Sequence, residues 1–234
     1  MAESEERRVL AKRKTEQAAV TSTQAYFALN RTAATGVDGQ TWEGYGANLQ
    51  DLHERIHSGS YKPRPTKRVW LPKPDGRKRP IGITALEDKI VQQALVWVLE
   101  SIYEEDFLGF SYGFRLGRSQ HQALDAVYMA LTTKKVGWVL DADIQGFFDH
   151  LDHEWLMQFV SHRVSDRRVL DILVRTLRAG VEDEGRRERT RAGTPQGAVI
   201  SPLLANIYLH ARTAFTRALL AAQTAPWLRP ALCP

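Results

Sequence analysis

Residues 138–156 have the sequence WVLDADIQGFFDHLDHEWL, the most informative stretch of the chain. We predict a β-strand over residues 137–144. Its apolar face would consist of Trp138, Leu140, Ala142 and Ile144. Because side chains alternate along a strand, Asp141 and Asp143 would share the opposite face. Two carboxylates near a strand end offer the hard oxygen ligands that Mg²⁺ prefers. By itself the pattern also fits an amphipathic strand with solvated acids.

A second informative stretch, residues 193–210, has the sequence GTPQGAVISPLLANIYLH. It combines a Pro-Gln-Gly turn with a predicted helix that begins near Ser201. The turn places an amide side chain and backbone donors at a helix N-terminus, where a phosphate or a sugar can bind. Alone, the motif more often marks an ordinary loop-to-helix junction.

Residues 61–80, YKPRPTKRVWLPKPDGRKRP, form a basic segment with two predicted strands, 68–72 and 79–83. Asp75-Gly76 between them is a hairpin turn signal. The segment holds eight basic residues and one acid, so its net charge is +7, whereas the whole chain carries +5 and the remainder therefore about −2. Such a cluster favours a polyanionic partner, because counterion release makes phosphate contacts favourable. The alternative is a solvated basic loop.

The rest of the chain is predicted to be mainly helical. Residues 1–34 have mixed charge and helical spacing, and a turn is expected at 36–39. Capping-box motifs open helices at Thr84 and at Ser119. The apolar stripe of the first consists of Leu86, Ile90, Leu95, Val98 and Ile102. Further helices are predicted at 41–58, 153–162 and 166–179, and a charged turn at 181–191. The predicted class is α+β, helix-rich with few strands.

Composition excludes several classes of protein. The chain has 234 residues, of which 43% are hydrophobic, enough for one large or two small domains with real cores. Its one cysteine, Cys233, excludes a disulfide framework and a cysteine-rich zinc site. Since no apolar run reaches the roughly 20 residues that span a bilayer, we expect a soluble, cytoplasmic protein without a membrane partner.

Five blocks together resemble the reverse transcriptases encoded by group II introns. The blocks are TGVDGQTWEGY, SYKPRPTKRVWLPKPDGRKRPIGITALEDKIVQQAL, SYGFRLGRSQHQAL, WVLDADIQGFFDHLDH and GTPQGAVISPLLANIYLH. They occur in the order and at the distances typical of that family, over nearly all of residues 30–210. A retron or another bacterial reverse transcriptase is the alternative, but the residues of the last block favour a group II intron reverse transcriptase.

The resemblance implies a right-hand polymerase fold, whose parts follow one another along the chain. Residues 1–34 would be an N-terminal helical extension, 35–136 the fingers, and 137–210 an incomplete, RRM-like palm. The resemblance stops after His210, and residues 211–234 contain seven alanines, three prolines and no acid. This divergent tail resembles translation in a shifted frame, although an Ala-rich helix is also possible.

The resemblance also implies roles for individual residues. Asp143, with the Ile144 carbonyl, would bind Mg²⁺ and be catalytic. Phe148 would be the steric gate that excludes a ribose 2′-OH and so favours dNTPs. The incoming nucleotide would also be bound by Lys73, Arg79, Gln196 and Gly197. Contacts with the RNA template would come from Lys67, Arg68, Arg77, Lys78, Tyr112, Phe114 and Arg115. The family usually has proline where this chain has Leu116.

The implied activity is that of an RNA-directed DNA polymerase, a nucleotidyltransferase, with a family role in intron splicing and mobility. Its partners would be intron or template RNA, a DNA primer and dNTPs; the oligomeric state stays open. The family's next motif, Tyr-x-Asp-Asp, does not occur in the sequence. We therefore expect a truncated chain that does not polymerise alone. The rival hypothesis is a non-catalytic RNA-binding remnant.

Overall fold

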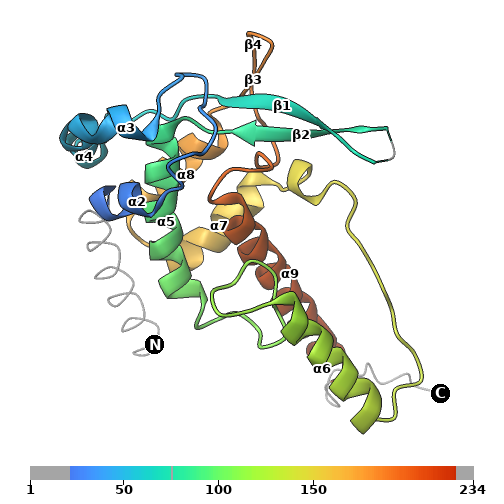
Figure 1. The fold of residues 1–234 in the computed structure, drawn as a ribbon. Coiled ribbons are helices and arrows are strands. Elements are labelled where there is room, and N and C mark those ends of the chain that lie inside the picture. The colour runs from blue at the N-terminus through green and yellow to red at the C-terminus, as the bar shows by residue number, and fades with distance from the viewer. Residues whose placement is uncertain (1–21, 75, 225–234) are drawn as a thin grey trace.

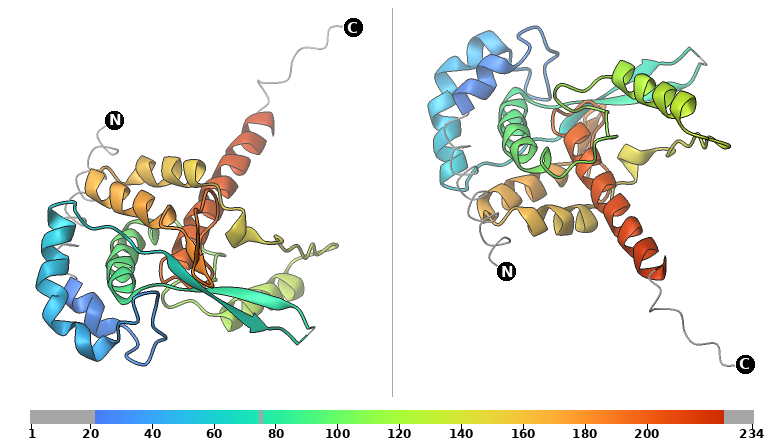
Figure 2. Two further views of the ribbon diagram at one scale, coloured as in Figure 1. Left: turned by 90° about the horizontal axis from the view of Figure 1, so that it is seen from above. Right: turned by 90° about the horizontal axis from the view of Figure 1, so that it is seen from below.

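A computed structural model describes residues 22–74 and 76–224 of the chain, and Figures 1 and 2 show the arrangement of its elements. Helices predominate, and one small sheet lies across one end of them. This arrangement agrees with the predicted helix-rich α+β class. Of the predicted N-terminal extension, helix α2 (Ser22–Ala28) is described, and Val9, Leu10 and Val20 lie outside the described residues.

Helix α5 (Leu86–Tyr103) is the centre of the hydrophobic core. The predicted apolar stripe is confirmed, because all its members are at most 6% exposed: Leu86, Ile90, Leu95, Val98 and Ile102. The predicted capping box at Thr84 is wrong. Ala85 occupies the N-cap position, and Glu87 accepts from the Arg55 guanidinium at 2.8 Å instead of reaching back to the helix start. An ion pair with a neighbouring helix has displaced the local cap.

Of the other helices, α2 and α9 (Ser201–Thr224) pack against α5. The predicted 41–58 helix is present but divided by a 3-10 turn into α3 (Trp42–Tyr45), η2 (Gly46–Asn48) and α4 (Leu49–His57). The expected turn at 36–39 is confirmed by a hydrogen bond from Gly39 N to Gly36 O of 3.2 Å. Helices α7 (His153–Arg163), α8 (Arg167–Leu177) and α9 (Ser201–Thr224) match their predictions. Helix α7 packs on both α8 and α9, so the two sequence regions that flank residues 181–200 are held together.

The sheet has the strand order β2-β1-β3-β4. The predicted hairpin is confirmed as β1 (Thr66–Pro72) and β2 (Lys78–Ile83), antiparallel, with Trp70 opposite Pro80. The predicted charged turn at 181–191 proves to be a second hairpin, β3 (Val181–Asp183) and β4 (Arg186–Glu188). These three-residue strands have no apolar alternation to reveal them, and β3 pairs in parallel with β1 from Thr66 opposite Val181.

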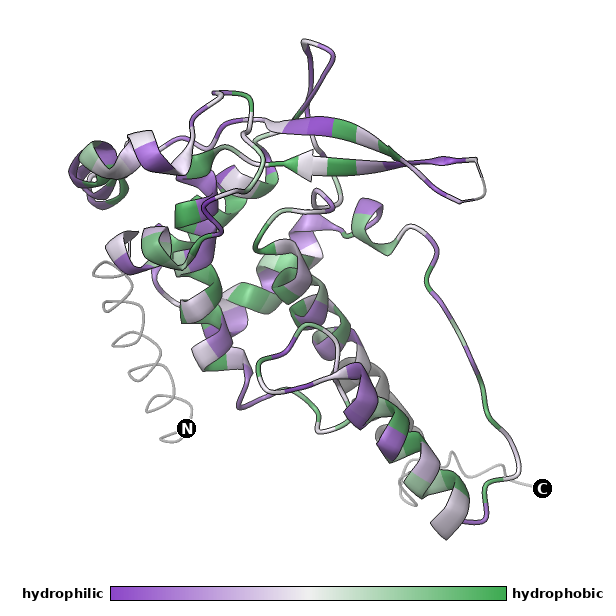
Figure 3. Cartoon of the chain, viewed as in Figure 1, coloured by the Kyte–Doolittle hydropathy of each residue, from purple (hydrophilic) through white to green (hydrophobic). Residues whose placement is uncertain are grey.

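The strand predicted at 137–144 is absent, and this is the largest correction to the sequence analysis. Helix α6 (Gln120–Thr133) begins with the predicted Ser119–Gln122 capping box, but it has no buried residue. From its end an irregular segment runs back to η3 (Phe147–Asp149), as Figure 1 shows. Trp138 is 96% exposed and Leu140 90%. A strand requires a hydrogen-bonded neighbour, and within the described residues no strand pairs with this segment. Figure 3 shows apolar residues along both α6 and the segment.

Candidate active site

An open cleft of about 670 Å³ lies between the β1–β2 hairpin, the segment that ends in η3, and the turn before α9. Its lining brings together most of the residues that the sequence analysis assigned to metal and nucleotide binding. These are Lys73, Arg79, Asp143, Ile144, Phe148 and Gln196. They come from three regions separated by up to 123 residues, so their convergence is a property of the fold and not of local sequence.

The hairpin gives the cleft a basic wall. Lys73, Lys78 and Arg79 are exposed and line it together. Arg79 Nε donates to Gln196 Oε1 at 3.1 Å, which joins the hairpin to the turn before α9. Ammonium and guanidinium groups in this position can neutralise the charge of a bound phosphate ester.

The Pro195-Gln196-Gly197 turn lies directly against β2. Gly82 N donates to Gln196 O at 2.6 Å. Gly197 has a φ of 103°, and a Cβ at this position would lie 2.9 Å from Gly82 O. Glycine is therefore needed at 197 for two reasons, the left-handed backbone and the close approach of a strand. The pairing fixes the Gln196 side chain at the rim of the cleft.

The same turn is also tied to η3. Thr194 N donates to Phe148 O at 2.7 Å, and Gly193 N donates to Leu151 O at 2.7 Å. The buried His153 ring approaches Gly193 O with Nε2 at 2.6 Å, and because a carbonyl only accepts, Nε2 is the donor. These contacts fix the position of Phe148 relative to Gln196. Phe148 is half-buried, and its ring lies edge-on to Phe147 with centroids 5.9 Å apart.

Two carboxylates line the cleft. Asp143 is one, and Asp149, which the sequence analysis missed, is the other. Both are exposed. Asp141 does not line the cleft. Among residues 22–74 and 76–224, no three His, Cys, Asp or Glu side chains converge as a potential metal site. The cleft therefore offers oxygen ligands for a cation without a complete protein-built cage. No distinctive sequence signal identified Asp149, because a single acid after the Phe147-Phe148 pair has no characteristic spacing.

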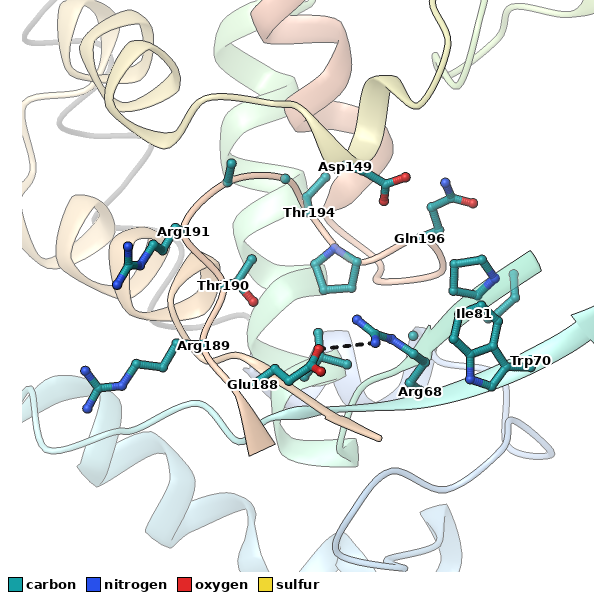
Figure 4. A pocket seen from close by; sticks show the side chains of 16 residues that line it. Arg68, Trp70, Ile81, Asp149, Glu188, Arg189, Thr190, Arg191, Thr194 and Gln196 are labelled. Atoms are coloured by element: carbon teal, nitrogen blue, oxygen red, sulfur yellow. Dashed lines mark hydrogen bonds and ion pairs between the residues drawn. The ribbon is translucent and has the colours of Figure 1, made fainter. Parts of the chain in front are cut away.

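A second cavity of about 440 Å³ lies on the other side of the Pro195-Gln196 turn, and Figure 4 shows its lining. It shares Pro80, Asp149 and Gln196 with the cleft. In Figure 4 the side chains of Arg189 and Arg191 lie on the side opposite to Trp70, which is 44% exposed. The two cavities thus flank one turn, and both are open to a ligand bound along the hairpin.

Arg68 belongs to this second cavity and not to a free basic surface. Its Nη1 lies 3.2 Å from both Asp183 Oδ2 and Glu188 Oε2, and its guanidinium lies 5.8 Å from the Trp70 ring centre. The predicted contact of Arg68 with RNA would therefore compete with these two acids. The two acids belong to the β3–β4 hairpin that the sequence analysis did not foresee. Lys67, Arg77 and Lys78 are exposed on or beside the β1–β2 hairpin, as predicted for contact residues.

The loop between α5 and α6 holds the other predicted template contacts. Phe114 is 72% exposed and Tyr112 is half-buried. Arg115, by contrast, is 8% exposed, and its guanidinium donates to Glu104 and to two backbone carbonyls within the loop. The prediction that Arg115 contacts RNA does not fit this placement, because its donors are already used inside the loop. None of the three lines the cleft or the second cavity.

A buried carboxyl anchors the segment that leads into β1. The Tyr61 hydroxyl donates to Asp88 Oδ1, and Arg64 N donates to Asp88 Oδ2 at 3.0 Å. Asp88 is 2% exposed, and its burial raises the pKa of the carboxyl to about 6. The hairpin is thus fastened to the core helix at its base, while its tip stays exposed at the cleft.

Comparison with known proteins identifies the family of the chain. The family model for reverse transcriptase (RNA-dependent DNA polymerase) matches residues 71–218, which include every residue of the cleft. The chain belongs to the reverse transcriptase family. Within that family it is similar to group II intron-encoded proteins. It is 36% identical over 184 residues to the group II intron-encoded protein LtrA of Lactococcus lactis subsp. cremoris, covering 77% of this chain and 30% of that protein.

Other relatives support the same assignment. The protein YkfC of Escherichia coli strain K12 is 44% identical over 165 residues, covering 69% of this chain and 43% of the relative. A partial Cas6-RT-Cas1–Cas2 complex matches the fold with a TM-score of 0.54 at 19% identity, over 85% of this chain and 34% of that chain. The matched region of this reverse transcriptase thus spans less than half the length of these relatives. No helix in its described residues is long and apolar enough to cross a membrane.

Proposed function

We propose that this chain forms the fingers and the first part of the palm of an RNA-directed DNA polymerase of the group II intron type. The observation that carries the proposal is the convergence of Lys73, Arg79, Asp143, Phe148 and Gln196 around one cleft. The N-terminal extension would end at about residue 34, the fingers would occupy 35–136, and the palm would begin at 137. From the similarity to a group II intron-encoded protein we also propose a role in intron splicing and mobility and a location in a bacterial cytoplasm or an organelle.

Several residues of the cleft would have distinct parts in the proposed reaction. The 3′-OH of a DNA primer attacks the α-phosphorus of a dNTP, a new P–O bond forms, and pyrophosphate leaves. Lys73 and Arg79 offset charge on the triphosphate as the leaving group departs. Phe148 fills the space beside C2′ and excludes a 2′-OH. Gln196, which is hydrogen-bonded to Arg79, would contact the nucleotide near its sugar, and we propose the same for Gly197, which follows it in the turn but does not line the cleft.

The donor set also fits a divalent cation. The family is metal-dependent, and we propose Mg²⁺, because exposed carboxylate and carbonyl oxygens are its preferred ligands. Asp143 and the Ile144 carbonyl would hold it. When bound, the metal supplies charge stabilisation to the attacking and leaving oxygens. A two-metal site uses further carboxylates, and Asp149 is the other acid that lines the cleft.

The RNA template would lie along the basic hairpin. Lys67, Arg77 and Lys78 would contact phosphates, and Tyr112 and Phe114 would contact bases. The second cavity, which shares the Gln196 turn with the nucleotide cleft, would take a template nucleotide other than the one that pairs with the incoming dNTP.

A non-catalytic RNA-binding role is the second candidate function. The observation in its favour is that Asp143 lies on an exposed segment without strand pairing, and no three potential metal ligands converge within the described residues. In that case the cleft and the hairpin would bind RNA and nucleotide without supporting phosphoryl transfer.

The deciding experiment joins residues 1–210 to the downstream part of the lactococcal relative and measures extension of a DNA primer on an RNA template. We expect extension with Mg²⁺ and dNTPs. Asp143→Asn should lower it by roughly a thousandfold, since a neutral amide forfeits several kcal/mol of charge stabilisation. Asp141→Asn, the matched control two residues away, should retain most activity because Asp141 does not line the cleft. Equal effects of the two substitutions would contradict the proposed role of Asp143.

A further inference from the structure

Two buried hydroxyl groups connect the turn before α9 to the helix itself. Thr194 is 5% exposed and Ser201 1%. Thr194 Oγ1 lies 2.6 Å from Ser201 Oγ, which in turn lies 2.9 Å from Pro195 O. Because a carbonyl only accepts and a serine hydroxyl has a single proton, Ser201 donates to Pro195 and Thr194 donates to Ser201. The two hydroxyls thus form a hydrogen-bond chain with one direction, from Thr194 to the Pro195 carbonyl.

Thr194 also holds the residue that is proposed to exclude ribose. Its backbone N–H donates to Phe148 O at 2.7 Å, while its hydroxyl donates to Ser201. Figure 4 shows Thr194 and Gln196 on the same turn. One residue therefore connects Phe148 on η3, Gln196 two positions later and Ser201 on α9. A shift of Thr194 would alter the space between Phe148 and Gln196.

The other side of the turn packs closely on β2. A Cβ added at Gly82 would lie 2.8 Å from Pro195 Cβ and 2.6 Å from Thr66 Cγ2. Gly82 N also donates to Gln196 O at 2.6 Å. The turn is thus held between β2 and α9, by backbone contact on the first side and by the hydroxyl chain on the second. Removing a hydroxyl should loosen the α9 side while the β2 side stays fixed.

We propose that Thr194 and Ser201 are positioning residues for sugar selection, whose hydroxyl chain holds Gln196 at a distance from Phe148 that admits deoxyribose and excludes ribose. This inference rests on the proposed function and deepens it, because it adds two buried residues to the specificity of the cleft. Neither residue lines the nucleotide cleft, and Ser201 lines neither cavity, so both act through the turn.

Burial explains why the chain specifies a position. A buried hydroxyl without a partner is costly, whereas replacing both partners by apolar groups of similar shape is nearly neutral. In Ser201→Ala the Thr194 proton loses its acceptor, and the turn has to move for that proton to find another. Thr194→Val removes the donor instead and leaves the turn without its side-chain link to α9. Both substitutions should therefore widen the range of positions that Gln196 occupies.

The test compares the binding of dATP and ATP, which differ only in the 2′-OH, to the full chain with Mg²⁺ by calorimetric titration. The unchanged chain should bind dATP roughly 10-fold more tightly or better. Ser201→Ala and Thr194→Val should each reduce this preference by roughly 2- to 10-fold, the equivalent of one hydrogen bond. Thr194→Ser keeps the hydroxyl and should retain the preference. Val169→Ala on α8, which removes buried apolar atoms outside both cavities, is the control for lower stability and should retain it too.

Amide hydrogen exchange on the same variants shows which side of the turn has loosened. In Ser201→Ala the amides of Thr194 and Ala198, which donate to Phe148 O and Pro195 O, should exchange faster. The Gly82 amide should keep its protection. The double variant Ser201→Ala with Thr194→Val should lower the preference for dATP no further than one substitution does, because both break the same chain. Additive losses would mean that the two hydroxyls act separately.

The outcomes distinguish this inference from the function on which it rests. If the unchanged chain binds neither nucleotide, the proposed function fails, and this inference fails with it. If the unchanged chain prefers dATP and both Ser201→Ala and Thr194→Val keep the full preference, only the positioning role is overturned. An equal loss of preference in Thr194→Ser or in Val169→Ala would also overturn it, because packing or overall stability would then set the selection.

Discussion

At the scale of single residues, the size of Phe148 should decide which sugar the cleft accepts. In the joined enzyme, Phe148→Ala should reduce discrimination between dNTPs and rNTPs by roughly 10- to 200-fold, because it opens space for a hydroxyl. Phe148→Tyr, which keeps the ring, should retain discrimination. The measurement is the ratio of kcat/KM for the two nucleotides. Unchanged discrimination in the alanine variant would mean that another group excludes the 2′-OH.

Which residues meet in the cleft was predictable from sequence where the family motif and the fold agree, as for Lys73, Phe148 and Gln196. The ion pairs of Arg68 and Arg115 were not predictable, because sequence does not reveal which carboxylate a guanidinium will meet. The partners of Arg68 lie more than 100 residues away, in strands too short to recognise. Asp149 was missed because a single acid after an aromatic pair has no distinctive spacing.

Asp88 should make the stability of the fold depend on pH. Its folded pKa of about 6 exceeds the ordinary 3.8, so its protonated form favours the folded state. The contribution is complete below about pH 4 and is lost as pH rises through 6. The full difference is about 3 kcal/mol in the free energy of unfolding. Relative to Asp88→Asn, the unchanged chain should lose this amount between pH 4 and 7 in urea titrations. A constant difference between the two proteins would contradict the raised pKa.

At the scale of elements, the β1–β2 hairpin should supply much of the salt dependence of RNA binding. Lys67→Ala and Lys78→Ala should each reduce the magnitude of the log K against log salt slope by about 0.7 to 0.9, the value for one lost phosphate contact. Arg68→Ala is the informative comparison, since Arg68 is paired with Asp183 and Glu188. It should leave the slope unchanged and lower stability instead. If Arg68→Ala reduced the slope and the two lysine variants did not, Arg68 and not the lysines would be the phosphate contact.

The elements also differ in how far sequence could predict them. Helix α5 and the hairpin were predictable because apolar periodicity and turn residues are local signals. The β3–β4 hairpin was not predictable, because its strands are short and charged and form by pairing with the edge of β1. The strand at 137–144 has the correct alternation, but alternation specifies only which face would be buried. It does not supply the neighbouring strand that would bury it.

The segment 137–144 should therefore exchange its amide hydrogens rapidly. Its side chains are largely exposed, and within the described residues no strand pairs with it. Amides of α5 should be protected to nearly the global stability, whereas those of 137–144 should exchange close to the rate of an unfolded chain. Hydrogen exchange with mass spectrometry measures both in one experiment. Equal, strong protection would show that the strand forms in solution.

At the scale of the whole molecule, binding and catalysis should separate. In the proposed function the β1–β2 hairpin and the turn before α9 would supply contacts with RNA and a nucleotide, because hydrogen bonds of the described structure hold them together. Phosphoryl transfer demands more, since carboxylates must clamp both the attacking and the leaving oxygens. Asp143 and Asp149 are the acids that line the cleft, and Asp143 lies on a segment without fixed pairing.

The chain by itself should thus bind RNA with a steep salt dependence yet fail to extend a DNA primer. The measurement pairs an RNA titration at two salt concentrations with a primer-extension assay on the same preparation, using Mg²⁺ and dNTPs. The joined enzyme serves as the positive control, so a lack of extension by the chain alone cannot be attributed to the assay. Mg²⁺-dependent extension by the chain alone, abolished by Asp143→Asn, would instead require that segment 137–144 become ordered when substrates bind, with Asp149 as the second carboxylate. Asp149→Asn would then abolish extension as well, and hydrogen exchange in 137–144 would slow in the ternary complex.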